Sequence, residues 1–356
     1  MSYLHGISLC CAQGERLPEK PQPPARVGFD FLGQHIDAPF YRAFPGDYLN
    51  RAELAALVHR HIQAAVAAAG WPEDWAADGA VFIGSTSHAM AEHERRWQAG
   101  RMGTTRSSLH EIAAELMARH GYAQPYCFAT SCTSAAHALL QAHRLLHGGV
   151  LARAVVVGVE AFNLMSLMHF HSVGLLGDDY RPFAADGFIL GEGVAALALS
   201  LESKPSGSLC LQAAAVDTDV GGLTETGSAA LEAVTRAALQ QAQVSPAEVR
   251  LVKAHAVGSA HSDAAEQSAL AAVFGDAVPL AGFKMLTGHT LGASAAIETA
   301  LLYQALQAGV LPAGARLPTA DGSVPNTDLP LADGAYITQF SGFGGSNLSM
   351  VWQWQS

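Results

Sequence analysis

Ala129-Thr130-Ser131-Cys132-Thr133-Ser134-Ala135-Ala136-His137 is the stretch that decides the fold, because it places one cysteine between small residues at the start of an apolar run with helical spacing. Residues 126–129, directly before it, are predicted to form a short strand. A buried strand that enters a helix through small residues is typical of an α/β protein. The start of a helix carries positive partial charge, so the sequence predicts that Cys132 favours its thiolate form.

Three segments far downstream add further reactive side chains. Lys253-Ala254-His255 supplies one histidine, and residues 284–293 supply Lys284 and His289. Residues 342–347 form a glycine-rich segment near the end of the chain. One cysteine, two separated histidines, a lysine and a glycine-rich segment together indicate a covalent acyl-transfer site.

Strands and helices are predicted to alternate along the whole chain, which indicates an α/β layered fold. Two similar halves are predicted within one compact unit: residues 1–205 contain Cys132, and residues 206–356 contain both histidines. Prolines crowd the segment 15–40, which is therefore predicted to be irregular. The predicted strands are 1–14 (with a turn), 79–84, 126–129, 154–158, 189–201, 209–216, 249–253, 336–340 and 348–354, and the predicted helices are 50–70, 107–120, 228–243, 263–274 and 292–309.

Composition excludes several classes of protein. Half of the 356 residues are hydrophobic and 14% are charged, as in a globular chain with a large core. The formal net charge of −11 argues against nonspecific nucleic-acid binding. No apolar run reaches the roughly 18–20 residues of a membrane helix, and no signal peptide is expected. Five cysteines without scaffold spacing favour the cytoplasm, and no metal site is expected because the His59–His61 and His169–His171 pairs lack further ligands.

Taken together, these motifs resemble the β-ketoacyl–acyl-carrier-protein synthases of the thiolase superfamily, the elongating condensing enzymes with a Cys-His-His triad. The resemblance covers roughly residues 45–356. It includes Arg181-Pro182-Phe183 and residues 186–193, which look like the family's RPF…DGF…GEG signature. It implies a thiolase-like fold in which two similar βαβαβαββ halves form a five-layered α-β-α-β-α core.

The resemblance also implies a reaction, a decarboxylative Claisen condensation. Cys132 would carry the acyl chain as a thioester. Malonyl-acyl-carrier protein would then lose CO2, and the resulting carbanion would attack the acyl group. The imidazoles of His255 and His289 would donate hydrogen bonds to the enolate oxygen. No cofactor is implied, because the substrates travel on the phosphopantetheine arm of the carrier protein.

Four supporting residues follow from the same resemblance. Lys284 would orient His289 through a charge network with Glu266, and Asp263 would be architectural. Phe343 would gate the site, and its backbone N–H would join that of Cys132 in an oxyanion hole.

The sequence departs from the family in the segment that contacts pantetheine. The family's His-Gly-Thr-Gly-Thr is replaced by His255-Ala256-Val257-Gly258-Ser259, so Ser259 retains a hydroxyl and Val257 does not. Ser341 replaces an aromatic residue near the gate. One lost hydrogen bond costs about 0.5–1.5 kcal/mol, so the grip on pantetheine is expected to differ. Residues 165, 168, 170 and 171 are our candidates for part of the acyl tunnel.

Three functions stay open from the sequence. The first is an active condensing enzyme, with a specialised polyketide or aryl-polyene role favoured over housekeeping fatty-acid synthesis. The second is a chain-length-factor-like partner subunit that shapes the tunnel of another synthase. The third is an acyltransferase or hydrolase that uses Cys132 without forming a carbon–carbon bond. The expected partners are acyl carrier protein and a second subunit, identical or different, with no nucleic acid and no membrane.

Overall fold

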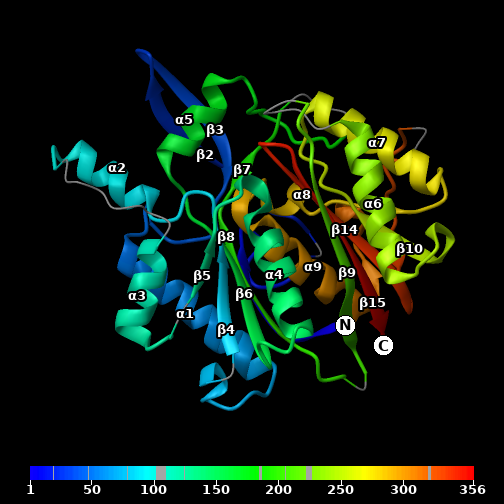
Figure 1. Ribbon diagram of the computed structural model, residues 1–356. Helices are drawn as coiled ribbons and strands as arrows, with labels where there is room; N and C mark the ends of the chain where they lie inside the picture. The colour runs from blue at the N-terminus through cyan, green and yellow to red at the C-terminus, as the bar shows by residue number, and fades with distance from the viewer. Residues whose placement is uncertain are drawn as a thin grey trace.

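A mixed sheet of ten strands runs through the molecule and is covered by helices on each side (Figure 1). The computed structural model describes residues 1–18, 20–46, 48–77, 79–101, 110–123, 125–183, 187–204, 206–221, 227–319 and 322–356. Within these ranges, no helix is both long and apolar enough to cross a membrane.

The first half of the sheet has the strand order β5-β4-β6-β8-β1. Strand β4 is parallel to both β5 and β6, whereas β8 is antiparallel to both β6 and β1. Strands β6 and β8 are apolar almost throughout, as expected for central strands covered on both faces. Their bounds are β1 Ser2–Cys11, β4 Gly79–Gly84, β5 Tyr126–Phe128, β6 Arg153–Glu160 and β8 Gly193–Ser200.

The second half repeats this topology with the order β11-β10-β14-β15-β9. Here β10 is parallel to β11 and β14, and β15 is antiparallel to β14 and β9. The halves join where β1 pairs with β9 over residues 2–4. The bounds are β9 Ser208–Thr218, β10 Val249–Lys253, β11 Leu280–Ala281, β14 Gly334–Gly342 and β15 Ser346–Gln355.

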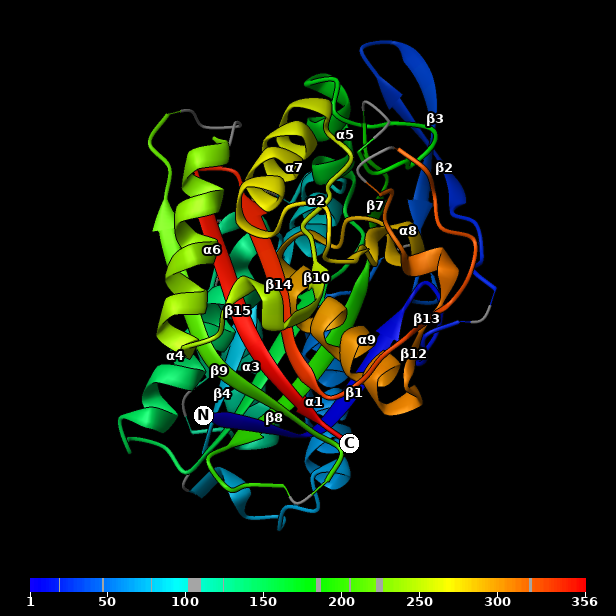
Figure 2. The same cartoon turned by 90° about the vertical axis from the view of Figure 1, so that its right-hand side faces the viewer.

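Three layers of helices alternate with the two half-sheets, and Figure 2 shows the second half of the sheet with its outer helices. Helices α4 and α9 pack against each other in the centre, and their apolar side chains form one core with both half-sheets. Helices α1 and α3 cover the outer face of the first half, and α6 and α7 cover that of the second. This is the five-layered thiolase-like fold. The helices are α1 Arg51–Ala68, α3 Glu111–His120, α4 Ser134–His147, α6 Ser228–Ala242, α7 Ala260–Phe274 and α9 Ser294–Ala308.

Local sequence sets the ends of these helices. Asn50 caps α1 by accepting a hydrogen bond from the N–H of Glu53, whose side chain bonds back to Asn50. Gly121 ends α3 in the left-handed conformation that glycine adopts at low cost. Two shorter helices, α2 Met90–Gln98 and α5 Leu164–Ser172, lie near the end of the molecule from which a hairpin projects.

That hairpin corrects the sequence analysis, which predicts an irregular segment over residues 15–40. Strands β2 (Ala25–Phe31) and β3 (Gln34–Tyr41) pair in antiparallel register, and β3 adds the short strand β7 (Leu190–Gly191). The turn at Leu32-Gly33 has positive φ at both residues, which matches the right-handed twist of a hairpin. Four of the prolines in this segment, at residues 18, 21, 23 and 24, precede β2, and only Pro39 lies within the hairpin.

The remaining elements are short. They are β12 (Val310–Leu311) paired with β13 (Leu329–Pro330), the single-turn helix α8 (Lys284–Thr287) and the 3-10 turns η1 (Trp75–Ala77), η3 (Ser131–Thr133), η4 (Pro246–Glu248), η5 (Leu291–Ala293) and η6 (Ala313–Ala315).

Candidate active site

Cys132 lies in a tight turn between β5 and the central helix α4, as the sequence predicts. Ser131 adopts a φ of 57°, which is strained for a residue with a side chain. Its carbonyl accepts hydrogen bonds from the hydroxyls of Thr86 (3.1 Å) and Ser134 (2.6 Å). These contacts hold the strained turn and fix Cys132 at the start of the helix.

A buried carboxylate that the sequence analysis did not single out ties this turn to its surroundings. Glu160, at the end of β6, accepts hydrogen bonds from the backbone N–H groups of Thr86 (2.9 Å), Ser87 (2.9 Å) and Gly292 (3.1 Å). Burial raises the pKa of Glu160, and these hydrogen bonds oppose that shift. A Cβ on Gly292 would lie 2.5 Å from the amide nitrogen of Thr86, so only glycine allows this approach.

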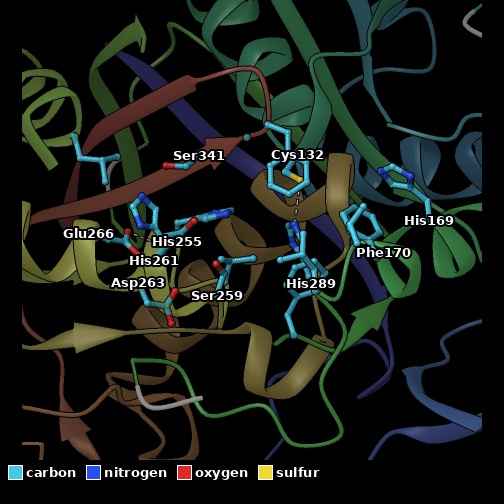
Figure 3. Close-up of a pocket in the computed structure, with 18 residues that line it drawn as sticks. Cys132, His169, Phe170, His255, Ser259, His261, Asp263, Glu266, His289 and Ser341 are labelled. Carbon is cyan, nitrogen blue, oxygen red and sulfur yellow. Dashed lines mark hydrogen bonds between the residues drawn. The ribbon is translucent and has the colours of Figure 1, made fainter. Parts of the chain in front are cut away.

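The resting state of the cysteine differs from the predicted thiolate. Cys132 is 5% exposed, and burial raises the pKa of its thiol to about 11. The Ser131 hydroxyl and the charge of Lys284 lower the pKa, but they do not offset burial. Cys132 therefore rests as a thiol, and its Sγ lies 3.0 Å from Nε2 of His289 (Figure 3). Since the hydroxyl of Ser294 lies 3.4 Å from the other ring nitrogen of His289, Nε2 is placed to accept the thiol proton.

The two histidines meet beside Cys132. Their ring centroids are 5.6 Å apart, and the planes are nearly perpendicular at 86°. Burial, followed by the charge of Lys284, lowers the pKa of both His255 and His289 well below the usual value. Both rings are therefore neutral at neutral pH, and Nδ1 of His255 is buried with no hydrogen-bond partner among the residues that the structure describes.

The signature segment at residues 181–193 holds the backbone of His289. The N–H of His289 donates to the carbonyl of Ile189 (2.7 Å), and the N–H of Gly191 donates to the carbonyl of His289 (3.1 Å). Glu192, in the same segment, accepts from the backbone of Ala43, Phe44 and Phe162 at the base of the hairpin. Asp186 lies outside the described residues.

Glu266 and Asp263 shape the backbone around His255. The carboxylate of Glu266 accepts the N–H groups of His255 and Ala256, each at 2.6 Å. Asp263 accepts the N–H groups of Phe183 (2.8 Å) and Gly258 (3.1 Å). Both carboxylates thus bind main-chain N–H groups around His255 and the signature segment.

Lys284 has a different partner from the one expected. Its Nζ lies 2.7 Å from Oε1 of Glu298 and 2.7 Å from the carbonyl of His255, so the charge network uses Glu298 rather than Glu266. Lys284 therefore supports the first histidine segment rather than His289. The sequence analysis missed Glu298 because it lies within the predicted helix 292–309, where a single acid resembles a solvent-exposed residue. Glu298 is in fact fully buried and also binds Lys253.

Removing this carboxylate is expected to destabilise the fold. In Glu298→Gln, two buried ammonium groups lose their common counter-ion, and breaking a buried pair typically costs about 3–5 kcal/mol. Urea unfolding should show a loss of that size. The matched variant Glu232→Gln, which breaks the exposed pair with Arg236, should change stability by less than about 1 kcal/mol. Equal losses in the two variants would contradict a structural role for Glu298.

A cavity of about 370 Å³ opens onto Cys132, His255 and His289. Six other site residues named from the sequence also line it: Val257, Ser259, Asp263, Glu266, Ser341 and Phe343. Of the four candidate tunnel residues, Phe170 lines the cavity and the other three do not. Helix α5 turns Phe170 and its neighbour His169 toward the cavity (Figure 3). Met165 is instead exposed. The rings of Phe170 and Phe343 are 6.0 Å apart at the cavity wall.

The cysteine turn has a counterpart in the second half that the sequence analysis did not detect. Thr290-Leu291-Gly292-Ala293-Ser294-Ala295-Ala296 repeats Thr130-Ser131-Cys132-Thr133-Ser134-Ala135-Ala136 at four of seven positions. Ser131 and Leu291 both have positive φ, and each turn leads into a central helix. The two turns contact each other, and this contact brings His289 to Cys132 across the pseudo-symmetric halves.

Fold and site together define a thiolase-like protein with a buried cysteine and two neutral histidines. Residues 22–204 match the family model "Beta-ketoacyl synthase, N-terminal domain", and residues 210–317 match "Beta-ketoacyl synthase, C-terminal domain". The chain belongs to the β-ketoacyl synthase family.

Curated relatives are similar over part of the chain. A mitochondrial 3-oxoacyl-[acyl-carrier-protein] synthase of Arabidopsis thaliana is 27% identical over 65% of this chain and 57% of its own. A putative polyketide β-ketoacyl synthase of Streptomyces cyaneus is 30% identical over 66% of this chain and 62% of its own. The match thus spans less than two thirds of either relative.

Solved structures share the whole fold. A chain in the complex of a ketosynthase with its chain length factor from Xenorhabdus doucetiae superimposes with a TM-score of 0.82 and 21% identity, covering 99% of this chain and 97% of its own. A chain of the ishigamide ketosynthase/chain length factor gives a TM-score of 0.84 and 20% identity, covering 100% and 99%. At these identities the likeness concerns the fold.

Proposed function

We propose that the protein is a condensing enzyme that joins an acyl thioester on Cys132 to malonyl-acyl-carrier protein with loss of CO2. The observation that carries this proposal is the contact of 3.0 Å between Cys132 Sγ and His289 Nε2, with the neutral His255 beside it on the same cavity. A nucleophile and a base within hydrogen-bond reach are what acyl transfer to a cysteine requires.

In the first half-reaction, His289 takes the proton of the Cys132 thiol as Sγ attacks the carbonyl carbon of the incoming thioester. Backbone N–H groups of Cys132 and Phe343 hold the oxyanion that forms. A Cβ on Gly342, next to Phe343, would lie 3.3 Å from the amide nitrogen of Cys132, so the two backbone segments are adjacent. The bond from carbonyl carbon to pantetheine sulfur then breaks, and the departing thiolate takes the proton from His289.

In the second half-reaction, the malonyl group loses CO2, and the electrons of the broken C–C bond form an enolate. The enolate oxygen accepts hydrogen bonds from the neutral imidazole of His255 and from that of His289, which donates in the tautomer that carries its proton on Nε2. Its α-carbon then attacks the carbonyl carbon of the acyl group on Cys132. The cysteine leaves as a thiolate and takes a proton from solvent to restore the resting thiol, and the product remains on the carrier as a β-ketoacyl thioester.

The expected partners are an acyl carrier protein and a second synthase-like subunit, identical or different. Strand β5 is the edge of the sheet beside the cysteine turn, and an edge strand provides a surface for pairing with another subunit. We favour a specialised pathway over fatty-acid elongation because the pantetheine segment departs from the family pattern at Val257, and relatives named for polyketide synthesis occur beside 3-oxoacyl-[acyl-carrier-protein] synthases. We further propose a cytoplasmic location, which suits the five free thiols, and no cofactor.

The test is the intact mass of the purified protein after incubation with acyl- and malonyl-carrier proteins. A self-sufficient condensing enzyme shows an acyl adduct on the protein and a carrier-bound product that is two carbons longer. An adduct without an extended product indicates an acyltransferase or hydrolase. Absence of both, with activity appearing only when a second synthase subunit is added, indicates the chain-length-factor-like role.

Restoring the missing hydroxyl should improve use of the carrier-bound substrate. Val257 and Ser259 both line the cavity, but only Ser259 has a hydroxyl for the pantetheine arm. Val257→Thr adds one hydrogen-bonding group of nearly the same volume, and about 0.5–1.5 kcal/mol corresponds to a gain of roughly two- to ten-fold in kcat/KM. The measurement is condensation at subsaturating malonyl-carrier protein. Val257→Ala, which adds no donor, should not improve kcat/KM, and an equal gain in both variants would contradict the hydrogen-bond explanation.

A further inference from the structure

Lys253 is a buried lysine to which neither half-reaction assigns a role. It ends strand β10, two residues before His255, and its side chain is fully buried. Its Nζ lies 2.5 Å from Oε2 of Glu298 and 2.7 Å from the carbonyl of Gln339, and 3.7 Å from the centroid of the Phe340 ring. A lysine is rarely removed from water so completely unless it has partners that compensate for desolvation.

The contacts of Lys253 connect the two sides of the cavity. Glu298 binds Lys253 through one oxygen and Lys284 through the other, and Lys284 binds the carbonyl of His255. On the opposite side, Gln339 and Phe340 lie in β14, whose end carries the cavity residues Ser341, Gly342 and Phe343. One buried ammonium group therefore joins the histidine segment to the strand that forms the gate.

Two buried cations lie close to both histidines. Lys253 and Lys284 share the carboxylate of Glu298, and the carboxyl group of Glu266 also interacts with the charge of Lys253. A second cation near an imidazole disfavours its protonated form. Other ionisable groups around the site are the cavity-lining His169 and His261, together with Asp263 and Glu266 of α7, Glu160 of β6, Cys132 and Tyr180.

We propose that Lys253 is a positioning residue of the condensing site, which fixes Glu298 and the β14 gate strand in place and adds a second positive charge beside His255 and His289. This inference rests on the proposed function. Lys253 does not line the cavity, so it acts on the reaction through its neighbours.

The test variant is Lys253→Met, which is expected to fold because it leaves a one-to-one pair between Lys284 and Glu298. Acyl loading should stay within about two-fold of wild type, because Cys132 and His289 keep their contact. Condensation should fall about ten-fold or more. With one cation removed, the pKa values of the histidines rise, so the acid limb of the pH–rate profile moves to higher pH.

Two further variants separate charge from packing. Lys253→Gln keeps a donor for the Gln339 carbonyl and removes the charge, so it should shift the acid limb as Lys253→Met does. Lys204→Met removes a lysine that contacts the Tyr303 hydroxyl at 3.0 Å and does not line the cavity, so it should leave the profile unchanged.

A readout that needs no turnover is the histidine titration followed by NMR, with His289 assigned from the His255→Gln spectrum. In Lys253→Met, the midpoint for His289 should rise by about half a pH unit or more. If the histidine midpoints do not move in Lys253→Met, the proposal is overturned. This holds if the loading and condensation rates are unchanged, and also if both rates fall together with Tm. If wild type forms no product, the proposed function fails, and the titration still decides for Lys253: a raised midpoint supports its electrostatic role and an unmoved one excludes it.

Discussion

Cys132→Ala should abolish acyl loading, so that intact-mass analysis detects no adduct after incubation with acyl-carrier protein. The substitution removes the sulfur that lies within hydrogen-bond reach of His289 Nε2 and that can attack a thioester and carry the acyl group covalently. Condensation should fall to background in the same variant. The variant is expected to fold, because alanine fits the space of the small thiol.

The matched control is Cys127→Ala. Cys127 lies five residues earlier on β5, and burial raises the pKa of its thiol to about 11, as for Cys132. It does not line the cavity, so its removal should leave the adduct at the wild-type level. An adduct that persists in Cys132→Ala and disappears in Cys127→Ala would show that Cys127 is the nucleophile and would contradict our proposal.

His255→Ala should separate the two half-reactions. His255 is placed to stabilise the enolate, and it is His289 rather than His255 that contacts the sulfur. Acyl loading should therefore persist while condensation falls about 10²- to 10³-fold, the usual effect of removing one oxyanion donor. His289→Ala should slow loading as well, because its Nε2 is the acceptor for the thiol proton. The measurements are single-turnover loading by mass and formation of the extended product.

A histidine outside the site provides the control for this pair. His143 binds the hydroxyl of Ser2 at 2.9 Å on helix α4 and does not line the cavity. His143→Ala should load and condense like wild type. Loss of loading in His255→Ala with an unchanged melting temperature would contradict the assignment of His255 to the second half-reaction alone.

The pH dependence of the wild type should follow the same assignments. Since burial and Lys284 lower the pKa of both histidines, the neutral form persists into mildly acidic solution and is lost only when the pH falls through the lowered values. Condensation should therefore show an acid limb well below the usual pKa of histidine. An acid limb at the usual value of about 6.5 would contradict the burial argument.

Several features follow from local sequence alone. The spacing of apolar residues changes between that of a strand and that of a helix along the chain, and this predicts the two α/β halves. The spacing is informative because it shows which side chains face the core. The small residues around Cys132 predict a tight turn into a helix, and this turn is found. The hairpin at residues 25–41 also carries a local signal, the two-residue turn Leu32-Gly33, which the preceding prolines obscured.

Tertiary structure alone decided the charges and partners within the site. Lys284 pairs with Glu298 rather than Glu266, and Lys253 is buried against the same carboxylate. The Cys132 thiol has a raised pKa although it starts a helix. Spacing along the chain reports which residues share an element, whereas ion pairs and pKa values depend on through-space distance and exclusion of water. Those quantities are fixed only when α8, α9 and β10 pack around the turns at Cys132 and Gly292. The sequence therefore determined which residues form the site, whereas the fold determined their protonation and their ion-pair partners.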